Sequence, residues 1–80
     1  MNIGKRSRYR VRLIHRNVPG VMARVNQIFA SSEANVDAQI LATVDEVGYV
    51  LTDISAGLGR EALEELSHLP ETVRLIATPL

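Results

Sequence analysis

Apolar residues along this 80-residue chain switch between two spacings, and the order of the switches restricts the fold more than any other feature. Alternation of apolar and polar residues indicates a half-buried strand, whereas apolar residues three and four apart indicate one face of a helix. The order along the chain is strand, helix, strand, strand, helix, strand. The predicted segments are 8–14, 20–33, 36–44, 47–55, 60–69 and 73–78.

That order in so short a chain predicts an α+β, ferredoxin-like βαββαβ fold, in which two helices cover one face of a four-stranded antiparallel sheet. The first strand is expected to turn Tyr9, Val11 and Leu13 towards the helices. Its arginines then lie outwards, and we interpret them as a solvated sheet face rather than as a nucleic-acid patch. The first helix is expected to bury one stripe, formed by Val21, Val25, Ile28 and Phe29.

The second half of the chain shows the same two apolar spacings, typical of strands and of a helix. A polar Asp45-Glu46 pair separates two apolar runs, which predicts a hairpin. Gly57 and Gly59 are expected to end the strand 47–55, and Pro70 to stop the second helix. The strand 36–44 is expected to bury alternate residues, namely Val36, Ala38, Ile40, Ala42 and Val44.

Composition narrows the functional classes. Hydrophobic residues make up 46% of the chain and the formal net charge is zero, so we expect one globular domain that binds neither nucleic acid nor membranes. The chain has no cysteine, hence no disulfide, zinc–thiolate site or thiol nucleophile. With no signal peptide or membrane-length apolar run, a cytoplasmic location is expected. Residues 1–7 are interpreted as a tail or linker remnant, and residues 8–80 as the domain.

The turn between the first strand and the first helix carries the polar groups of interest. His15 and Asn17 offer donors and acceptors, and Pro19 suits a first helical turn. Gly20 allows close backbone approach, and the free N–H groups of a helix start attract a small carboxylate. The alternatives are structural: Asn17 as the helix N-cap, Asn35 as a turn residue, and His15 as an ordinary core histidine.

Several short motifs resemble one known family. They are His15-x-Asn17-x-Pro19-Gly20-Val21, Ile28-Phe29-Ala30, Asn35-Val36-x-Ala38-Gln39, Gly48-Tyr49-Val50 and Asp53-Ile54. Together they resemble the C-terminal ACT domain of bacterial D-3-phosphoglycerate dehydrogenase, over about residues 8–76. The resemblance implies a regulatory domain that binds L-serine, or a similar small amino acid, and inhibits an NAD-dependent parent enzyme. The segment 55–60 looks shorter than in that family.

The resemblance also implies site residues. Its serine-binding histidine falls on His15 and its two binding asparagines fall on Asn17 and Asn35, with Pro19, Gly20 and Val21 completing the loop. No catalytic residue, metal or cofactor is implied for this chain. If His15 donates to the ligand carboxylate as an imidazolium, affinity should weaken as the pH rises past its titration.

Topology predicts where those residues lie. The first two strands run parallel in this fold, so His15 and Asn35 are expected at opposite ends of the sheet, on the order of 25 Å apart. A site that contains both therefore needs two chains. We predict a homodimer through the strand 36–44, which is expected at an edge of the sheet. In the parent enzyme the catalytic domains would be further partners.

Other functions are weighed against this one. An RNA-recognition domain shares the topology, but it needs more aromatic residues on its middle strands than Tyr9 and Tyr49 supply. An acylphosphatase-like hydrolase would need a glycine-rich loop beside Arg16 and Asn17, and the sequence has none there. The remaining alternative is a ferredoxin-like assembly module without a small-molecule ligand.

Overall fold

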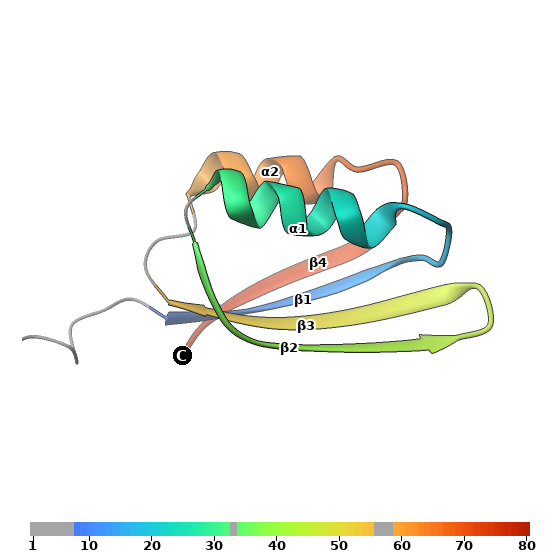
Figure 1. Ribbon diagram of the computed structural model, residues 1–80, viewed down its shortest axis with the longest axis horizontal. Coiled ribbons are helices and arrows are strands. Elements are labelled where there is room, and N and C mark those ends of the chain that lie inside the picture. Colours follow the sequence, from blue (N-terminus) through green and yellow to red (C-terminus); the bar gives the residue numbers. More distant parts are fainter. Residues whose placement is uncertain (1–7, 33, 56–58) are drawn as a thin grey trace, which may run out of the picture.

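The computed structural model describes residues 8–32, 34–55 and 59–80. Within them the elements follow the predicted order (Figure 1): β1 (Arg8–Arg16), α1 (Val21–Ser31), β2 (Asn35–Val44), β3 (Val47–Ser55), α2 (Arg60–Ser67) and β4 (Thr72–Pro79). The sheet order is β2-β3-β1-β4, and every neighbouring pair is antiparallel. Both helices lie on one face of the sheet (Figure 1), which confirms the ferredoxin-like fold. Neither described helix is long and apolar enough to cross a membrane.

The core lies between the sheet and the two helices. The predicted stripe on α1 is confirmed, because Val21, Val25 and Phe29 are buried and Ile28 packs against them. Alternate residues of the two central strands complete this layer. The buried core cluster consists of Val11, Leu13, Val21, Val25, Phe29, Val50, Ile54 and Leu66.

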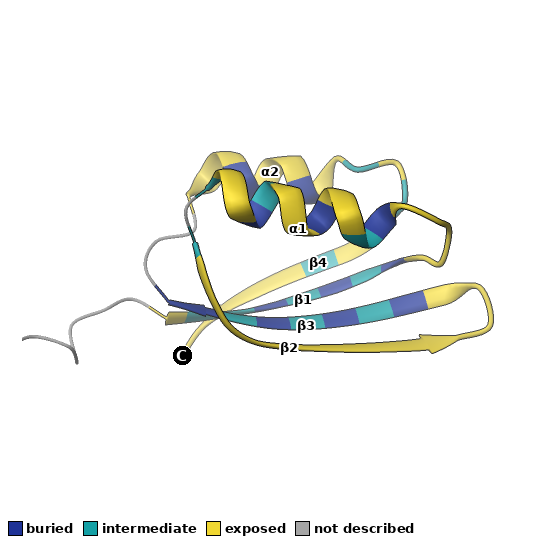
Figure 2. Cartoon of the chain, in the orientation of Figure 1, coloured by how far each residue is buried: buried dark blue, intermediate teal, exposed yellow. Residues whose placement is uncertain are grey.

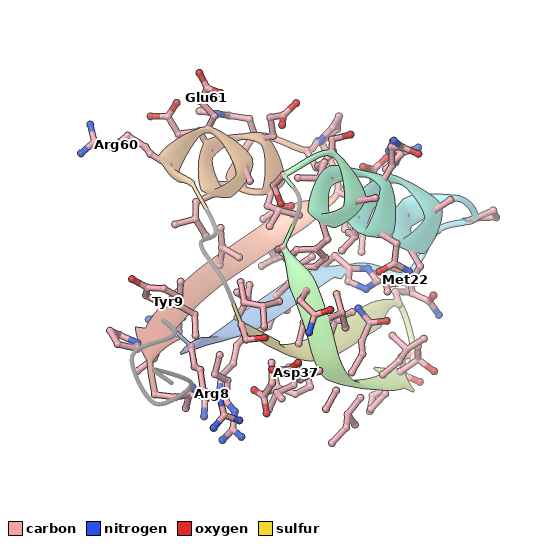
Figure 3. The ribbon with its side chains drawn as sticks, turned by 60° about the vertical axis from the view of Figure 1, so that its left-hand side comes forward. Arg8, Tyr9, Met22, Asp37, Arg60 and Glu61 are labelled. Atoms are coloured by element: carbon pink, nitrogen blue, oxygen red, sulfur yellow. The ribbon has the colours of Figure 1, made fainter. Side chains whose placement is uncertain are left out.

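The arginines of β1 lie on the other face of the sheet, as predicted. Figure 3 shows Arg8 on the side away from the helices. Arg10 binds Asp53 of β3 with two parallel hydrogen bonds, Nε to Oδ1 at 2.7 Å and Nη2 to Oδ2 at 2.9 Å. This bidentate pair joins the two central strands across the outer face. The hydrogen bond from Arg10 holds the pKa of Asp53 below its ordinary value of 3.8.

This pair predicts part of the acid sensitivity of the fold. A carboxyl whose pKa is lowered on folding stabilises the protein above its unfolded pKa, and that contribution is lost as the pH falls through the folded pKa. We therefore expect Asp53→Asn to lose less stability between pH 6 and pH 3 than the wild type. Urea denaturation at both pH values measures the difference, and parallel losses would contradict it.

One part of the sheet prediction is wrong: the face that β2 presents. Gln39 pairs with Thr52, a buried residue of β3 that faces the helices. Its Nε2 donates to Thr52 Oγ1 at 3.0 Å and to Asn26 Oδ1 on α1 at 3.1 Å. Gln39 therefore lies on the helix side, and Ile40, paired with Leu51, lies on the outer side.

A β-bulge explains the reversal. The pairing of β2 with β3 shifts by one residue between Val36 and Ala38, where Asp37 has no ladder partner. A shift of one residue moves every following side chain to the other face. Val36, before the bulge, still pairs with buried Ile54, yet it is 42% exposed. The burial predicted for the rest of this strand is wrong for Ala38, Ile40, Ala42 and Val44, all of which are exposed.

The ends of the elements differ from prediction by a few residues. β1 continues to Arg16, two residues past the expected end. α2 ends at Ser67, before Leu69 and Pro70, and the Ser67 hydroxyl donates to the Glu64 carbonyl in the last turn. The predicted hairpin is confirmed: Val44 pairs with Val47, and Asp45 has a positive φ of 55°, which Asp tolerates better than most residues. The role expected of Gly57 and the segment 56–58 lie outside the described residues.

Candidate functional site

Three loops meet at the end of the sheet where β1 finishes. The N–H of Arg16 donates to the carbonyl of Glu71, in the loop before β4, at 2.8 Å. The N–H of Asn17 donates to the carbonyl of Glu46, in the β2–β3 hairpin, also at 2.8 Å. The turn that carries the candidate residues is therefore fixed on both sides by backbone hydrogen bonds.

The start of α1 follows this turn. Gly20 is the N-cap residue and has a φ of 89°, a left-handed conformation that suits glycine. The alternative that Asn17 caps the helix is therefore wrong, and its side chain is exposed instead. Pro19 lies in the turn before the helix rather than in its first turn, and Val21, the first helical residue, is buried. The leading N–H groups of α1 lack partners within the helix, as at any helix start.

His15 is buried beside this turn. It continues the inward row of β1 and is 2% exposed. Its Nδ1 donates to the carbonyl of Arg16 at 2.8 Å. The imidazole lies against Gly48, the opposite residue on β3, so closely that a Cβ there would fall 2.3 Å from His15 Cε1. Gly48 belongs to one of the motifs that resemble the family, but no sequence pattern predicted that it makes room for the His15 ring.

An ion pair next to His15 was missed by sequence reasoning. Arg24 of α1 binds Glu71 through Nη2 and Oε2. The hydrogen bond from Arg24 holds the pKa of Glu71 below its ordinary value, and the charge of His15 acts in the same direction. These two residues are far apart in sequence, and no local pattern joins them.

Asn35 lies at the first position of β2, at the other end of the sheet. Its Nδ2 donates to Asp37 Oδ1 at 2.8 Å and to Ser55 Oγ at 3.2 Å, and Ser55 Oγ donates to the same Asp37 oxygen at 3.1 Å. Figure 3 shows Asp37 on this strand. Because an ionised carboxylate only accepts hydrogen bonds, the amide must direct its N–H groups here. Its carbonyl oxygen remains available to accept.

The structure does not bring His15 and Asn35 together. His15 pairs with Gly48 of β3, whereas Asn35 pairs with Ser55, seven positions further along the same strand. At ~3.3 Å per residue the two levels are about 23 Å apart along the strand. The predicted separation within one chain is confirmed, and only His15, Asn17, Pro19, Gly20 and Val21 cluster.

Three hollows on the described surface lie away from these residues. One of about 350 Å³ lies between the end of α1 and the start of α2, and two others lie along α2. None of these three is lined by His15, Asn17 or Asn35. Within the described ranges, no three His, Asp or Glu side chains group in a way that suits a metal ion.

Comparison with known proteins identifies the family. The family model described as "AHAS small subunit-like ACT domain" matches residues 11–74. This chain belongs to the ACT domain family. A D-3-phosphoglycerate dehydrogenase of Dictyostelium discoideum is 37% identical to this ACT domain over 68 residues, which are 85% of this chain and 16% of that protein. The D-3-phosphoglycerate dehydrogenase of Escherichia coli (strain K12) is 41% identical over 63 residues, or 76% of this chain and 15% of that protein.

Solved structures agree on the fold. The ACT domain from GTP pyrophosphokinase of Chlorobium tepidum superposes with a TM-score of 0.76 at 10% identity, covering 91% of this chain and 99% of that chain. A homoserine dehydrogenase from Thiobacillus denitrificans gives 0.74 at 24% identity, covering 94% of this ACT domain and 17% of that chain. This ACT domain spans about one sixth of the length of its phosphoglycerate dehydrogenase relatives.

Proposed function

We propose that this chain is a regulatory domain that binds L-serine, or a similarly small amino acid, between two copies of itself. The domain would act in the cytoplasm as part of an NAD-dependent phosphoglycerate dehydrogenase and inhibit it when serine accumulates. The relatives named D-3-phosphoglycerate dehydrogenase support the parent enzyme. The proposed site contains His15, Asn17, Pro19, Gly20 and Val21 of one copy and Asn35 of the other.

The main support for the proposed dimer is the exposure of β2. All ten residues of this edge strand are exposed (Figure 2). They include large apolar side chains, among them Ile40 at 60% and Val44 at 71% exposure. A long apolar edge with free backbone groups is a template for pairing with another strand. Antiparallel pairing of two β2 strands would join the two sheets around a two-fold axis.

Such pairing would also assemble the site. With the two-fold axis near Ile40, at the middle of β2, Asn35 of one copy lies beside the 45–46 hairpin of the other. That hairpin already contacts the binding loop through the bond from Asn17 N–H to the Glu46 carbonyl. Pairing thus brings Asn35 towards the loop of the partner, and symmetry gives two equivalent sites.

The first prediction concerns assembly. Sedimentation equilibrium at tens of micromolar protein should show a dimer, and Ile40→Lys should shift it to monomer because two like charges meet near the axis. Val73→Lys is the matched control, since Val73 is 62% exposed on the opposite edge strand β4. A dimer that survives Ile40→Lys but dissociates with Val73→Lys would move the interface to β4.

The second prediction concerns the ligand. Calorimetric titration with a panel of amino acids should show L-serine binding. A ligand bound only by the folded state adds about 2.7 kcal/mol to stability at a hundredfold excess over its Kd, so the melting temperature should rise as well. Dimerisation without heat from any amino acid would favour a pure assembly module and contradict the proposal.

A further inference from the structure

The outer face of the sheet, which lies away from the helices, is largely apolar on β2 and β3. Figure 1 shows both helices on the opposite face, and no described element covers this one. An antiparallel sheet with one solvated face commonly turns polar residues outwards. Here the outward residues pair as apolar couples, with Ile40 opposite Leu51, Ala42 opposite Tyr49 and Val44 opposite Val47. We call these six residues the apolar band.

The bulge in β2 turns its part of the band outwards. In the unshifted register Gln39, Leu41 and Thr43 would face outwards, and Ile40 would face the helices. The bulged strand therefore exposes three apolar residues on the outer face where the other register would expose one apolar and two polar ones. A contiguous apolar patch on a protein surface commonly marks a site of interaction.

Arginines flank the apolar band. The basic flank, as we call it, consists of four arginines at outward positions: Arg8, Arg12 and Arg16 of β1 and Arg74 of β4. Arg12 is next to the band, because it pairs with Leu51. Within residues 8–32, 34–55 and 59–80, none of these four forms an ion pair with a carboxylate. Such arginines beside an apolar band indicate a partner that is both apolar and acidic.

Pairing of two β2 strands would leave the outer face open. Edge pairing uses backbone groups in the plane of the sheet, whereas the side chains of the band stand roughly perpendicular to it. In the proposed dimer the two bands would lie side by side. Their four strands, about 4.8 Å apart, would form an apolar surface about 14 Å wide, with a basic flank on either side. An α-helix, about 10 Å in diameter, fits such a surface.

Charge selects the occupant of this face. A second copy stacked face to face would bring arginines against arginines, because the dimer carries them on both sides of the band, and facing like charges oppose association. Carboxylates are the matching groups, since a guanidinium binds a carboxylate through two parallel hydrogen bonds. Arg10 and Asp53 already form such a pair on this face.

We propose that the outer face of the sheet is a docking surface for an acidic amphipathic helix of a protein partner. Apolar side chains of that helix cover the apolar band, and its carboxylates bind the basic flank. This assignment replaces the solvated face that the sequence suggested for the arginines. Each chain carries the face by itself, so docking needs no amino-acid ligand.

Peptide binding to the wild type tests the proposal and needs no variant to fold. The 80-residue protein is titrated into a fluorescein-labelled peptide of about 18 residues, ~27 Å long as a helix, with leucine on one face and glutamate on the other. Fluorescence anisotropy should show that it binds at least tenfold more tightly than a peptide with lysine in place of glutamate. Raising the ionic strength from about 0.01 M to about 0.1 M shortens the Debye length from about 30 Å to about 10 Å and should weaken this binding at least threefold.

Charge reversal locates the binding surface. Arg74→Glu should weaken binding of the glutamate peptide at least fivefold, because Arg74 is an exposed member of the basic flank. Arg60→Glu is the matched control. It makes the same change in net charge at an exposed position of α2, on the other side of the sheet, and should change the affinity less than twofold. Val47→Thr keeps the shape of a band residue but adds a hydroxyl, and should weaken binding at least twofold.

Several outcomes would overturn the proposal. They are absence of binding, equal binding of the two peptides, and equal effects of Arg74→Glu and Arg60→Glu. Tighter binding to vesicles of phosphatidylcholine and phosphatidylserine, or to poly(U), would assign the face to a membrane or to RNA instead. Association beyond a dimer that strengthens with salt would assign it to a second copy. Failure to bind any amino acid would remove the proposed function but leave these results unaffected.

Discussion

Gly48→Ala should lower the free energy of unfolding by roughly 1–3 kcal/mol, the usual cost of forcing extra atoms into a packed interior. The added Cβ would fall 2.3 Å from Cε1 and 2.6 Å from Nε2 of His15. The ring has little freedom to retreat, because it is 2% exposed and its Nδ1 is bound to the Arg16 carbonyl. For a domain of this size each kcal/mol lowers the melting temperature by about 4–8 °C, which thermal unfolding measures.

The same substitution should also weaken serine binding, because it displaces the ring of His15, a residue of the proposed site. Gly59→Ala is the control for steric clash: nothing lies within 4 Å of its Cβ position, so it should cost only the weaker N-cap of α2, about 1 kcal/mol or less. A double-mutant cycle identifies the cause. In a His15→Ala background the clash is absent, and Gly48→Ala should then be close to neutral. An equal loss with and without the ring would show that the His15 contact is not responsible.

The parts of the fold that sequence reasoning predicted correctly are those with an unbroken period. β1 alternates from Arg8 to Leu13, with an arginine at every second position, and α1 repeats its apolar stripe over two turns, so each pattern admits one arrangement. β2 does not. Ile40 and Leu41 are adjacent and both apolar, so either face of the strand satisfies the pattern. The bulge at Asp37 decides between the two, and it depends on pairing with β3 rather than on local sequence.

The contacts of the candidate site likewise include some that the sequence predicted and some that it did not. His15, Asn17 and Gly20 follow one another along the chain, so their common location at the strand-to-helix turn was predictable. Glu71 and Arg24 are brought together only by the packing of α1 over the start of β4. Likewise the close approach of Gly48 to His15 results from the β1–β3 register. Contacts of this kind leave no local sequence pattern, because each depends on where a distant segment packs.

A mixed dimer should recover one site of native affinity from two damaged proteins. His15→Ala and Asn35→Ala should each weaken serine binding by roughly 1–3 kcal/mol, about 5- to 150-fold, through loss of a hydrogen-bond partner. Each variant homodimer has two damaged sites. If the site is shared between copies, both substitutions of a heterodimer with one substitution per chain fall in the same site. The other site then retains His15 of one chain and Asn35 of its partner.

Titration of a purified, differently tagged heterodimer distinguishes a shared site from two private ones. The shared site predicts binding at half the wild-type stoichiometry with wild-type affinity. Sites contained in single chains would each keep one lesion, so every site in the heterodimer would bind weakly. The register supports the first outcome, because His15 lies level with Thr43 and Asn35 level with Arg8, at opposite ends of the same sheet. One chain alone cannot close a pocket of a few ångströms around groups held that far apart by rigid strands.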